Sequence, residues 1–279
     1  MIIWIASYPK SGNTLIRSIL GTYFFSDDGI FDFKHTYRIG QFPVLEHFKK
    51  LNIDTSNRED VFRNYVQAQE KFNHENPRIK FYKTHSLFFD RKDHSFSDLK
   101  NTLGAVYVVR DPRNVVTSFA HHYGVSLSEA TKQICNNDLF SGKTDQHPEV
   151  FISSWKLNYL TWKSLGKKVL IIKYEDLIGE KKKTELLKIF KFFETLGMNK
   201  SSFNIAKLNK VIKTTEFTRM KSLEKKIGFD EASIDSKTGK TKAFFNLGPK
   251  NNWRNNLTDE IRIKIENEFK KEMIELGYL

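Results

Sequence analysis

A loop rich in hydrogen-bond donors follows the apolar segment at the start of the chain. Ile2 to Ser7 is almost wholly apolar, which predicts a buried strand, and the sequence YPKSGNT (residues 8–14) comes directly after it. A helix predicted over Ser11 to Phe25 begins in this loop, so free backbone N–H groups gather at the positive end of its dipole. Lys10 adds a full charge, and Ser11 and Thr14 add hydroxyl donors. These features predict an anion-binding loop; a plain strand–turn–helix connection with a solvated lysine is the alternative.

A second anion site is predicted at the end of the strand Gly104–Arg110. Asp111 and Pro112 follow it and are typical of an N-cap and a first helical turn. Arg110 then lies at the carboxyl edge of the sheet, where open α/β proteins bind ligands, and Ser118 lies within the first two turns of the helix. A lone Arg-Asp pair at a strand end is often a structural ion pair. Together with the first loop, however, it predicts a ligand with two separate phosphate groups.

A histidine at the end of a third strand is the candidate general base. The predicted strand Ile79–Lys83 runs into Thr84 and His85. The pKa of histidine suits proton transfer near neutral pH, and the end of a parallel strand projects over the same crevice. His85 is one of eight histidines, so a packing role is the alternative. His121 and His122 have no metal-ligand spacing, and no metal site is predicted.

The elements that must position these residues alternate between strands and helices. This order predicts a mostly parallel central β-sheet flanked by helices on both faces, an α/β fold. A fourth strand is predicted at Lys168–Tyr174. Helices are predicted near Arg58–His74, Pro112–Tyr123, Ser126–Asn136, Pro148–Leu165 and Lys181–Leu196, and from Thr258 to Gly277. Asp27–Gln41 and Lys221–Lys242 lack this periodicity and are predicted to be substrate-binding loops, the second a mobile lid.

The size and composition of the chain limit what it can be. Its 279 residues, with 39% hydrophobic side chains, suit a single α/β domain over residues 1–279. One cysteine excludes a disulfide scaffold. No apolar run approaches the roughly 18 residues that a membrane span needs, and no signal peptide is recognised, so a cytoplasmic protein is expected. The net charge of +13 favours anionic partners.

These motifs, in this order, resemble those of the sulfotransferases that use 3′-phosphoadenosine 5′-phosphosulfate (PAPS). YPKSGNT resembles that family's 5′-phosphosulfate loop. VVRDPRNVVTSF resembles its 3′-phosphate segment, with the arginine and serine spaced as Arg110 and Ser118 are. KTH at 83–85, YED at 174–176 and TEF at 215–217 resemble further segments, and the similarity extends over about residues 1 to 260. The resemblance implies a P-loop-NTPase-like fold and transfer of a sulfuryl group from PAPS to an acceptor hydroxyl, with adenosine 3′,5′-bisphosphate (PAP) as product and no metal.

The resemblance also implies a role for each matching residue. Lys10 would stabilise the leaving phosphate, His85 would take the proton of the acceptor hydroxyl, and Lys83 would stabilise charge near the sulfuryl group. The nucleotide would be held at its 5′-phosphate by Lys10, Ser11, Gly12, Asn13 and Thr14, at its 3′-phosphate by Arg110 and Ser118, and at its adenosine by Tyr174, Thr215 and Phe217.

The sequence departs from the family pattern in places. Leu15 stands where the cytosolic-type enzymes usually carry a tryptophan that stacks on adenine, so Phe217 is the expected substitute. The C-terminal RKG motif is eroded, with Asn246 at the position of its arginine, and Lys250 or Arg254 is expected to replace that contact to the 3′-phosphate. The family's short dimerisation motif is not matched, so the sequence predicts no oligomeric state.

Two other function classes compete with this interpretation. A P-loop kinase would use a similar sheet, with Asp176 binding Mg²⁺, but the glycines of its phosphate loop would have to stand at Trp4 and Pro9. A nucleic-acid-binding protein would explain the charge, but KKK at 181–183 is the only basic triple and no nucleic-acid-binding motif is found, so no such partner is expected. The acceptor is predicted only as a small molecule or a carbohydrate.

Overall fold

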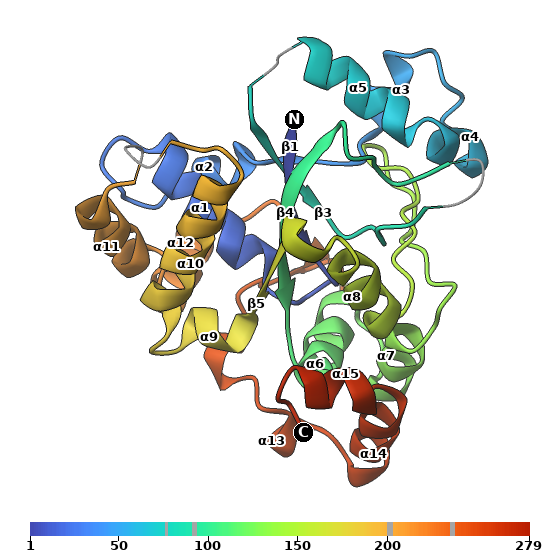
Figure 1. Cartoon of the computed structure of the whole chain (residues 1–279). Coiled ribbons are helices and arrows are strands. Elements are labelled where there is room, and N and C mark those ends of the chain that lie inside the picture. Colours follow the sequence, from blue (N-terminus) through green and yellow to red (C-terminus); the bar gives the residue numbers. More distant parts are fainter. Residues whose placement is uncertain (76–77, 91–93, 200–202, 235–237) are drawn as a thin grey trace.

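A five-stranded parallel sheet forms the centre of the molecule (Figure 1). The computed structural model describes residues 1–75, 78–90, 94–199, 203–234 and 238–279. The strands lie in the order β2 (Gly40–Gln41), β3 (Lys80–Thr84), β1 (Ile2–Ser7), β4 (Thr102–Val109) and β5 (Val169–Lys173). All four neighbouring pairs are parallel. The predicted fold class is confirmed, and the first strand is the central one.

Strand β1 is buried along its whole length because both of its faces are covered. Alternate side chains of a strand point to opposite faces of the sheet. Ile3 and Ile5 accordingly join one hydrophobic core, whereas Ile2, Trp4 and Ala6 join the other. This two-sided burial explains why the segment reads as a continuous apolar run rather than as an alternating one.

Different helices cover the two faces of the sheet (Figure 1). One face packs against α1 (Asn13–Phe25), α10 (Lys182–Thr195) and α11 (Ile205–Thr214). The other packs against α4 (Arg58–Arg63), α5 (Tyr65–Glu75), α6 (Pro112–Tyr123), α7 (Leu127–Ile134), α8 (Trp155–Lys163), α14 (Asp259–Glu268) and α15 (Lys270–Glu275). Of the apolar residues that the sequence places along α10, Leu186, Ile189, Phe190 and Phe193 are buried in the first of these cores, whereas Leu187 is exposed.

The register of the sheet brings three strand ends together. Ala6 pairs with Thr84 across β1 and β3, and Ser7 pairs with Val108 across β1 and β4. The segments that follow these strands therefore leave the same edge of the sheet. Residue 8 begins the donor-rich loop, His85 follows β3 and Arg110 follows β4. Asp111 caps α6 as predicted, by accepting a hydrogen bond from the backbone N–H of Arg113 at 2.9 Å.

Several helices differ from their predicted lengths. The helix predicted from Thr258 is divided at Phe269, whose φ of −114° is not helical, and the one predicted near Arg58–His74 is divided at Asn64. Residues 148–154 precede α8 and are not helical. The remaining short elements are α2 (Phe33–Tyr37), α3 (Leu45–Lys49), α9 (Tyr174–Ile178), α12 (Phe217–Ile227), α13 (Trp253–Asn256), the 3₁₀ turns Gly166–Lys168 and Gly248–Lys250, and the pair β6 (Ser233–Ile234) and β7 (Thr241–Lys242).

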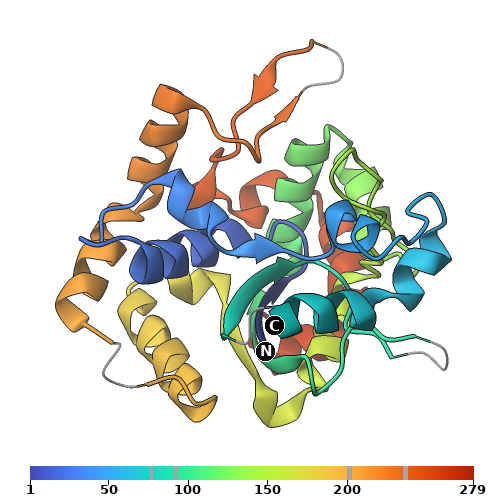
Figure 2. The ribbon, with the colours of Figure 1, turned by 90° about the horizontal axis from the view of Figure 1, so that it is seen from above.

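The segment predicted as a loop over Lys221–Lys242 is more ordered at its start than expected. Its first seven residues complete α12, and β6 and β7 form a hairpin that stands away from the body of the molecule (Figure 2). Residues 235–237 of the predicted lid lie outside the described residues. Between α12 and β6, Phe229 joins a small third core with Phe31, Phe33, Met220 and Phe245. This third core joins Asp27–Gln41 to the C-terminal third of the chain. That stretch was predicted as a substrate-binding loop but contains α2 and β2, and none of its residues lines the cavity described below.

None of the helices within the described ranges is both long enough and apolar enough to cross a lipid bilayer.

Candidate functional site

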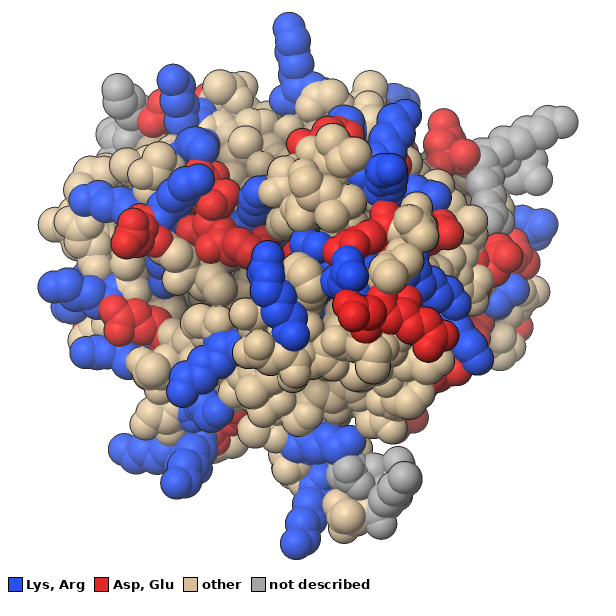
Figure 3. Space-filling view, turned by 90° about the horizontal axis from the view of Figure 1, so that it is seen from below, with Lys and Arg blue, Asp and Glu red and all other residues tan. Residues whose placement is uncertain are grey.

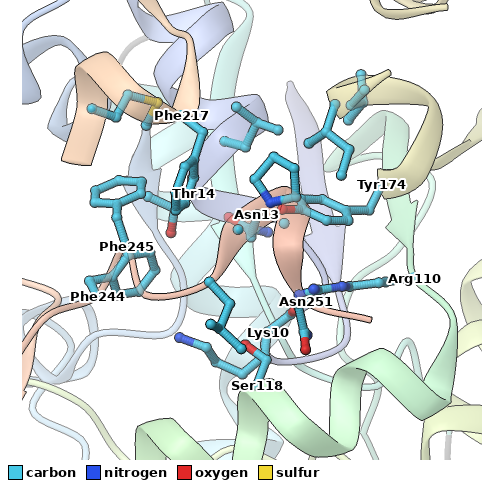
Figure 4. A pocket seen from close by; sticks show the side chains of 18 of the residues that line it. Lys10, Asn13, Thr14, Arg110, Ser118, Tyr174, Phe217, Phe244, Phe245 and Asn251 are labelled. Carbon is cyan, nitrogen blue, oxygen red and sulfur yellow. The ribbon is translucent and has the colours of Figure 1, made fainter. Parts of the chain in front are cut away.

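A cavity of about 690 Å³ opens at the edge of the sheet where β1, β3 and β4 end. Figure 4 shows Lys10, Arg110, Ser118 and Asn251 gathered in one part of it, with Tyr174 beside Arg110 and Phe217, Phe244 and Phe245 in another part. Of the predicted site residues, the cavity is lined by Lys10, Gly12, Asn13, Thr14, Lys83, His85, Arg110, Ser118, Tyr174, Thr215 and Phe217. The two cationic segments therefore face one cavity and not different faces of the molecule.

The loop after β1 is shaped by two residues in the left-handed region. Lys10 has a φ of 65° and Gly12 a φ of 106°, and a Cβ at Gly12 would lie 2.4 Å from the ring of Tyr174. Only glycine combines this φ with this close approach. Helix α1 begins immediately afterwards, at Asn13, so its unpaired N–H groups open onto the cavity. This geometry is that of an anion-binding helix N-terminus.

The side chains of Asn13 and Ser11 point away from the cavity opening, into the protein. The Asn13 amide donates to the carbonyl of Ile5 at 2.9 Å and to Ser7 Oγ at 3.3 Å, which ties the helix start to β1. Ser11 is fully buried and does not line the cavity, and its hydroxyl has no hydrogen-bond partner within the described residues. The predicted contact of Ser11 with the 5′-phosphate stays a prediction, and its buried hydroxyl does not face the cavity in this arrangement.

The Lys10 ammonium group is held in the cavity and forms no ion pair with any carboxylate of the described residues. Its Nζ lies 4.1 Å from the centre of the Phe244 ring. Burial is the main reason that the pKa of Lys10 falls to about 7; Glu231 opposes the shift, whereas Arg110 adds to it. A ligand anion placed beside this nitrogen would reverse the shift, because a nearby negative charge stabilises the ammonium form.

Arg110 is buried and only partly satisfied. One guanidinium nitrogen donates to the carbonyl of Lys10 at 2.9 Å, and the guanidinium carbon lies 4.3 Å from the centre of the Tyr174 ring. Its Nε is buried and has no hydrogen-bond partner among the residues that the structure describes. An unpartnered donor on a buried cation is costly unless an anion arrives. Ser118 on α6 lines the same cavity as Arg110.

His85 is fixed by the residues behind it. Its Nδ1 lies 2.8 Å from the backbone carbonyl of Ser7 and 3.3 Å from the Ser7 hydroxyl. Because a carbonyl only accepts hydrogen bonds, Nδ1 carries the proton, and the lone pair is on Nε2. The Asn158 amide holds the His85 carbonyl at 3.1 Å. Burial, and then the charge of Lys83, lower the pKa of His85 to about 3, so the imidazole is neutral in the empty site.

Glu231, which the sequence did not single out, occupies the space between the phosphate loop and Lys83. Its carboxylate accepts hydrogen bonds from Thr14 Oγ1 at 2.7 Å and from Arg17 at 2.5 Å, and it lies 3.6 Å from Lys83 Nζ. Arg17 was not predicted either, although it lies one turn after Thr14 on α1. No local pattern marks Glu231, since its partners are more than 140 positions away in the chain.

The segment that follows α12 lines the opposite wall. The backbone N–H groups of Phe244 and Phe245 donate to the Glu224 carboxylate at 2.6 and 3.0 Å, which fixes both rings at the cavity. The Phe217 ring packs directly against Gly248. A Cβ atom at position 248 would lie 2.2 Å from this ring, so the close contact requires a glycine there. Phe217, the expected substitute for the tryptophan missing at Leu15, thus lines the cavity, and its contact with adenine stays a prediction.

The structure does not bring Lys250 into the cavity. Lys250 ends an exposed 3₁₀ turn, and the next residue, Asn251, lines the cavity instead. The Asn251 side chain accepts from Thr117 at 2.7 Å and donates to the carbonyl of Asn114 at 2.9 Å. Arg254, the other expected substitute, is exposed, and its guanidinium carbon lies 4.4 Å from the centre of the Trp253 ring. Lys250 in the 3₁₀ turn and Arg254 on α13 both lie at the surface outside the lining of the cavity, so their predicted contact with the 3′-phosphate stays untested.

Comparison with known proteins supports the resemblance inferred from the motifs. A family model described as a sulfotransferase domain matches residues 2–277. Rat sulfotransferase 1E1 is 26% identical over 275 residues, which cover 96% of this chain and 82% of the relative, and flavonol 3-sulfotransferase of Flaveria bidentis is 24% identical and covers 95% and 79%.

The fold is also similar to solved structures. Mouse sulfotransferase SULT7A1 complexed with PAP superposes with a TM-score of 0.60 at 19% identity and covers 97% of this chain and 83% of that one. Retinol dehydratase in complex with androsterone and PAP superposes with a TM-score of 0.57 at 15% identity and covers 98% and 80%. At these identities the likeness shows a shared P-loop-like fold.

Proposed function

This chain belongs to the sulfotransferase domain family, and we propose that it moves a sulfuryl group from PAPS to a hydroxyl group of a small organic acceptor. That it is a sulfotransferase follows from the family match over nearly the whole chain. The proposal concerns the donor, the roles of individual residues and the acceptor. The observation that carries it is one cavity lined by both Lys10 and Arg110, the latter with an unpartnered Nε.

PAPS has an anionic group at each end of its ribose, and the cavity has two groups of donors that could bind them. The N–H groups at the start of α1, the Thr14 hydroxyl and the Lys10 ammonium would hold the 5′-phosphosulfate. Arg110 and Ser118 would hold the 3′-phosphate, where the Arg110 Nε gains the acceptor that it lacks. Tyr174, Thr215 and Phe217 would surround the adenosine. The solved structures of SULT7A1 and retinol dehydratase contain PAP, which is consistent with this assignment.

The chemistry then follows from the positions of three side chains. Nε2 of His85 takes the proton of the acceptor hydroxyl while the oxygen of that hydroxyl forms a bond to the sulfur of PAPS. The bond between sulfur and the bridging oxygen breaks, and its electron pair stays on the 5′-phosphate of the departing PAP. The Lys10 ammonium stabilises that charge, and Lys83 stabilises the charge spread over the sulfuryl oxygens. Ser7 supports this step, since its carbonyl fixes the tautomer of His85.

The acceptor side favours a small, largely apolar alcohol or phenol. Phe244, Phe245 and Tyr123 contribute aromatic surface to the cavity, and His121 and His122 contribute imidazoles. Related structures were solved with retinol or androsterone, which are apolar hydroxyl compounds. A carbohydrate remains the second candidate named from the sequence, and the cytoplasmic location expected from the sequence remains part of the proposal.

The rival functions have less support in the geometry. Asp176, the Mg²⁺ ligand of the kinase alternative, does not line the cavity and pairs with Lys181 at 3.6 Å. On the face shown in Figure 3, Lys and Arg side chains are scattered among acidic and uncharged ones, without the continuous basic stripe that a nucleic-acid backbone requires.

The test is transfer of labelled sulfate from PAPS to a panel of phenols, steroid-like alcohols and sugars, in the presence of EDTA. A thermal-shift comparison of PAP with ATP and Mg²⁺ accompanies it. We expect PAP to raise Tm by several degrees at saturation and ATP with Mg²⁺ to have a smaller effect. Stabilisation by ATP with Mg²⁺ but not by PAP would contradict the proposal and favour the kinase.

A further inference from the structure

The Glu231 carboxylate lies among groups that the donor itself needs. It accepts from the Thr14 hydroxyl at 2.7 Å, pairs with Arg17 at 2.5 Å and lies 3.6 Å from Lys83 Nζ. These three partners come from the first two turns of α1 and from the end of β3, the two elements that flank the proposed position of the 5′-phosphosulfate. The side chains of Arg17, Lys83 and Glu231 are 4%, 11% and 21% exposed, so the cluster is largely shielded from water.

A bound donor and the observed position of Glu231 are in conflict. The Thr14 hydroxyl has one proton, and that proton is directed at Glu231, so it is not available to a phosphate oxygen. A carboxylate and a phosphosulfate at adjacent positions would also repel each other strongly in a shielded cavity. Either Glu231 moves when the donor binds, or the donor binds without the Thr14 hydrogen bond and next to a second negative charge.

When the donor is absent, the Glu231 carboxylate neutralises buried cations. Arg17 is buried, and an unpaired buried guanidinium group is costly. Its Nη1 donates to Glu231 and its Nη2 to the carbonyl of Thr36 at 3.4 Å, whereas its Nε has no hydrogen-bond partner within the described part of the chain, so Glu231 is its only anionic partner there. The charges of Lys83 and Arg17 keep the pKa of Glu231 far below its usual range against the effect of burial, so the side chain remains an anion. Glu231 thus supplies the negative charge that these cations require.

The segment that carries Glu231 can move without disturbing the central sheet. It follows Phe229, which belongs to the small third core and not to the two cores of the sheet as the described residues form them. Tyr37 also holds this segment, because its ring stacks on Phe229 and its hydroxyl accepts from the Asp230 N–H at 3.3 Å. Ala232 donates to the carbonyl of Phe229 at 3.0 Å, a local turn that does not depend on the sheet. Moving this turn therefore leaves the sheet and the phosphate loop intact.

We propose that Glu231 is an internal ligand of the empty donor site, which the 5′-phosphosulfate displaces from Thr14, Arg17 and Lys83. The inference rests on the proposed function, because it needs the donor to bind at Thr14. One anion replaces another on the same cations, so these cations stay neutralised before and after binding. Glu231 thereby sets the affinity for the donor and releases the site only to a ligand that carries an anionic 5′-group.

The test compares nucleotides that differ only at the 5′-position. Glu231→Gln removes the charge while keeping the size of the side chain. We expect it to tighten PAP binding by at least about tenfold, the change that corresponds to ~1.4 kcal/mol. Adenosine 3′-monophosphate, which lacks the 5′-phosphate, should bind the wild type and the variant within about twofold of each other. Both affinities are measured by isothermal titration calorimetry on the full chain.

Thermal unfolding gives a second readout. Without nucleotide, Glu231→Gln should lower Tm by a few degrees because Arg17 and Lys83 lose their counter-ion, and saturating PAP should close this gap. Asp230→Asn is the matched control, since it removes the same charge from the adjacent, exposed position and should change neither PAP affinity nor Tm appreciably. Should Glu231→Gln fold poorly, Glu231→Asp, which withdraws the carboxylate by one methylene, should tighten PAP binding to a smaller extent.

The possible failures are distinguishable. If neither wild type nor variant binds PAP, the proposed donor is wrong. If the wild type binds PAP and Glu231→Gln binds it equally or more weakly, Glu231 is not displaced by the donor and the present inference is overturned. A loss of turnover at unchanged PAP affinity would likewise overturn it and would place Glu231 on the acceptor side.

Discussion

The depressed pKa of Lys10 predicts that the nucleotide binds more weakly as the pH rises above neutrality. In the empty site the pKa of this group is about 7, mainly because of burial. A phosphate next to the ammonium group must raise it, so binding is accompanied by proton uptake. The affinity is therefore fully present below pH 7 and falls as the pH rises through and beyond that value, since an increasing share of the free enzyme must first be protonated.

The size of the effect follows from the two protonation states. With a pKa of about 7 in the free enzyme, half of the Lys10 side chains are protonated at pH 7 and about one in a hundred at pH 9. The dissociation constant of PAP should therefore rise by about 50-fold between pH 7 and pH 9. The ligand adds little to this change, because the second pKa of a phosphate monoester is near 6.

Titration calorimetry of PAP at pH 7, 8 and 9, in two buffers of different ionisation enthalpy, measures both the affinity and the proton uptake. At pH 8 Lys10 should contribute close to one proton per nucleotide to the uptake by the wild type, as expected for a free-enzyme pKa of about 7. Lys10→Arg is the control, because a guanidinium group stays charged over this range. Lys182, whose pKa burial lowers to about 8, also lines the cavity and contributes equally to both proteins, so the difference between them isolates Lys10.

Two results would refute the reasoning. A dissociation constant that stays level from pH 7 to pH 9 would mean that Lys10 is charged in the empty site or does not contact the nucleotide. An equally steep loss of affinity in Lys10→Arg would assign the titration to another group. Lys10→Met offers an internal check, since it lacks the ammonium group at every pH and at pH 7 should bind PAP at least as weakly as the wild type does at pH 9.

Three further predictions follow from the same site. His85→Ala should lower kcat at least about 10²-fold while PAP affinity stays within about threefold, and a parallel loss of both would make His85 a structural residue. Arg110→Ala should weaken PAP binding at least about tenfold and adenosine 5′-monophosphate binding hardly at all, since only PAP has a 3′-phosphate; equal weakening in calorimetry would reject the two-phosphate arrangement. Gly12→Ala should destabilise the fold in urea by at least about 2 kcal/mol, because of its positive φ and the nearby Tyr174 ring, whereas Gly142→Ala, with open space around its Cβ, should be close to neutral.

The parts of the fold with strong local signals were predictable. The apolar run Ile2–Ser7 is β1 at the predicted bounds, and Pro112–Tyr123 is α6 at the predicted bounds. Both predictions depend on neighbouring residues: a two-sided strand reads as a continuous apolar segment, and Asp-Pro marks a helix start. The strand ends that carry Lys10, His85 and Arg110 were predicted for the same reason.

The parts that depend on distant contacts were not predictable. Helix α9 is only five residues long, too short for a full apolar repeat to appear in the sequence. The position of Glu231 depends on how the segment after α12 folds back onto α1, and nothing near residue 231 signals it. Lys250 was chosen for its charge, but the direction of the chain after Gly248 decides that Asn251 lines the cavity instead.

The central position of the first strand has a consequence for biosynthesis. Ile2–Ser7 pairs on one side with Lys80–Thr84 and on the other with Thr102–Val108, so during translation it emerges long before either neighbour exists. Parallel pairing over such sequence separations is slow, and an unpaired apolar strand readily associates with other chains. The segment Ile2–Ser7 therefore stays without its full pairing until about a hundred further residues have been synthesised. Proteolytic fragments that end before Arg110 should be inert rather than partly active, since the machinery for catalysis is assembled only when the sheet closes.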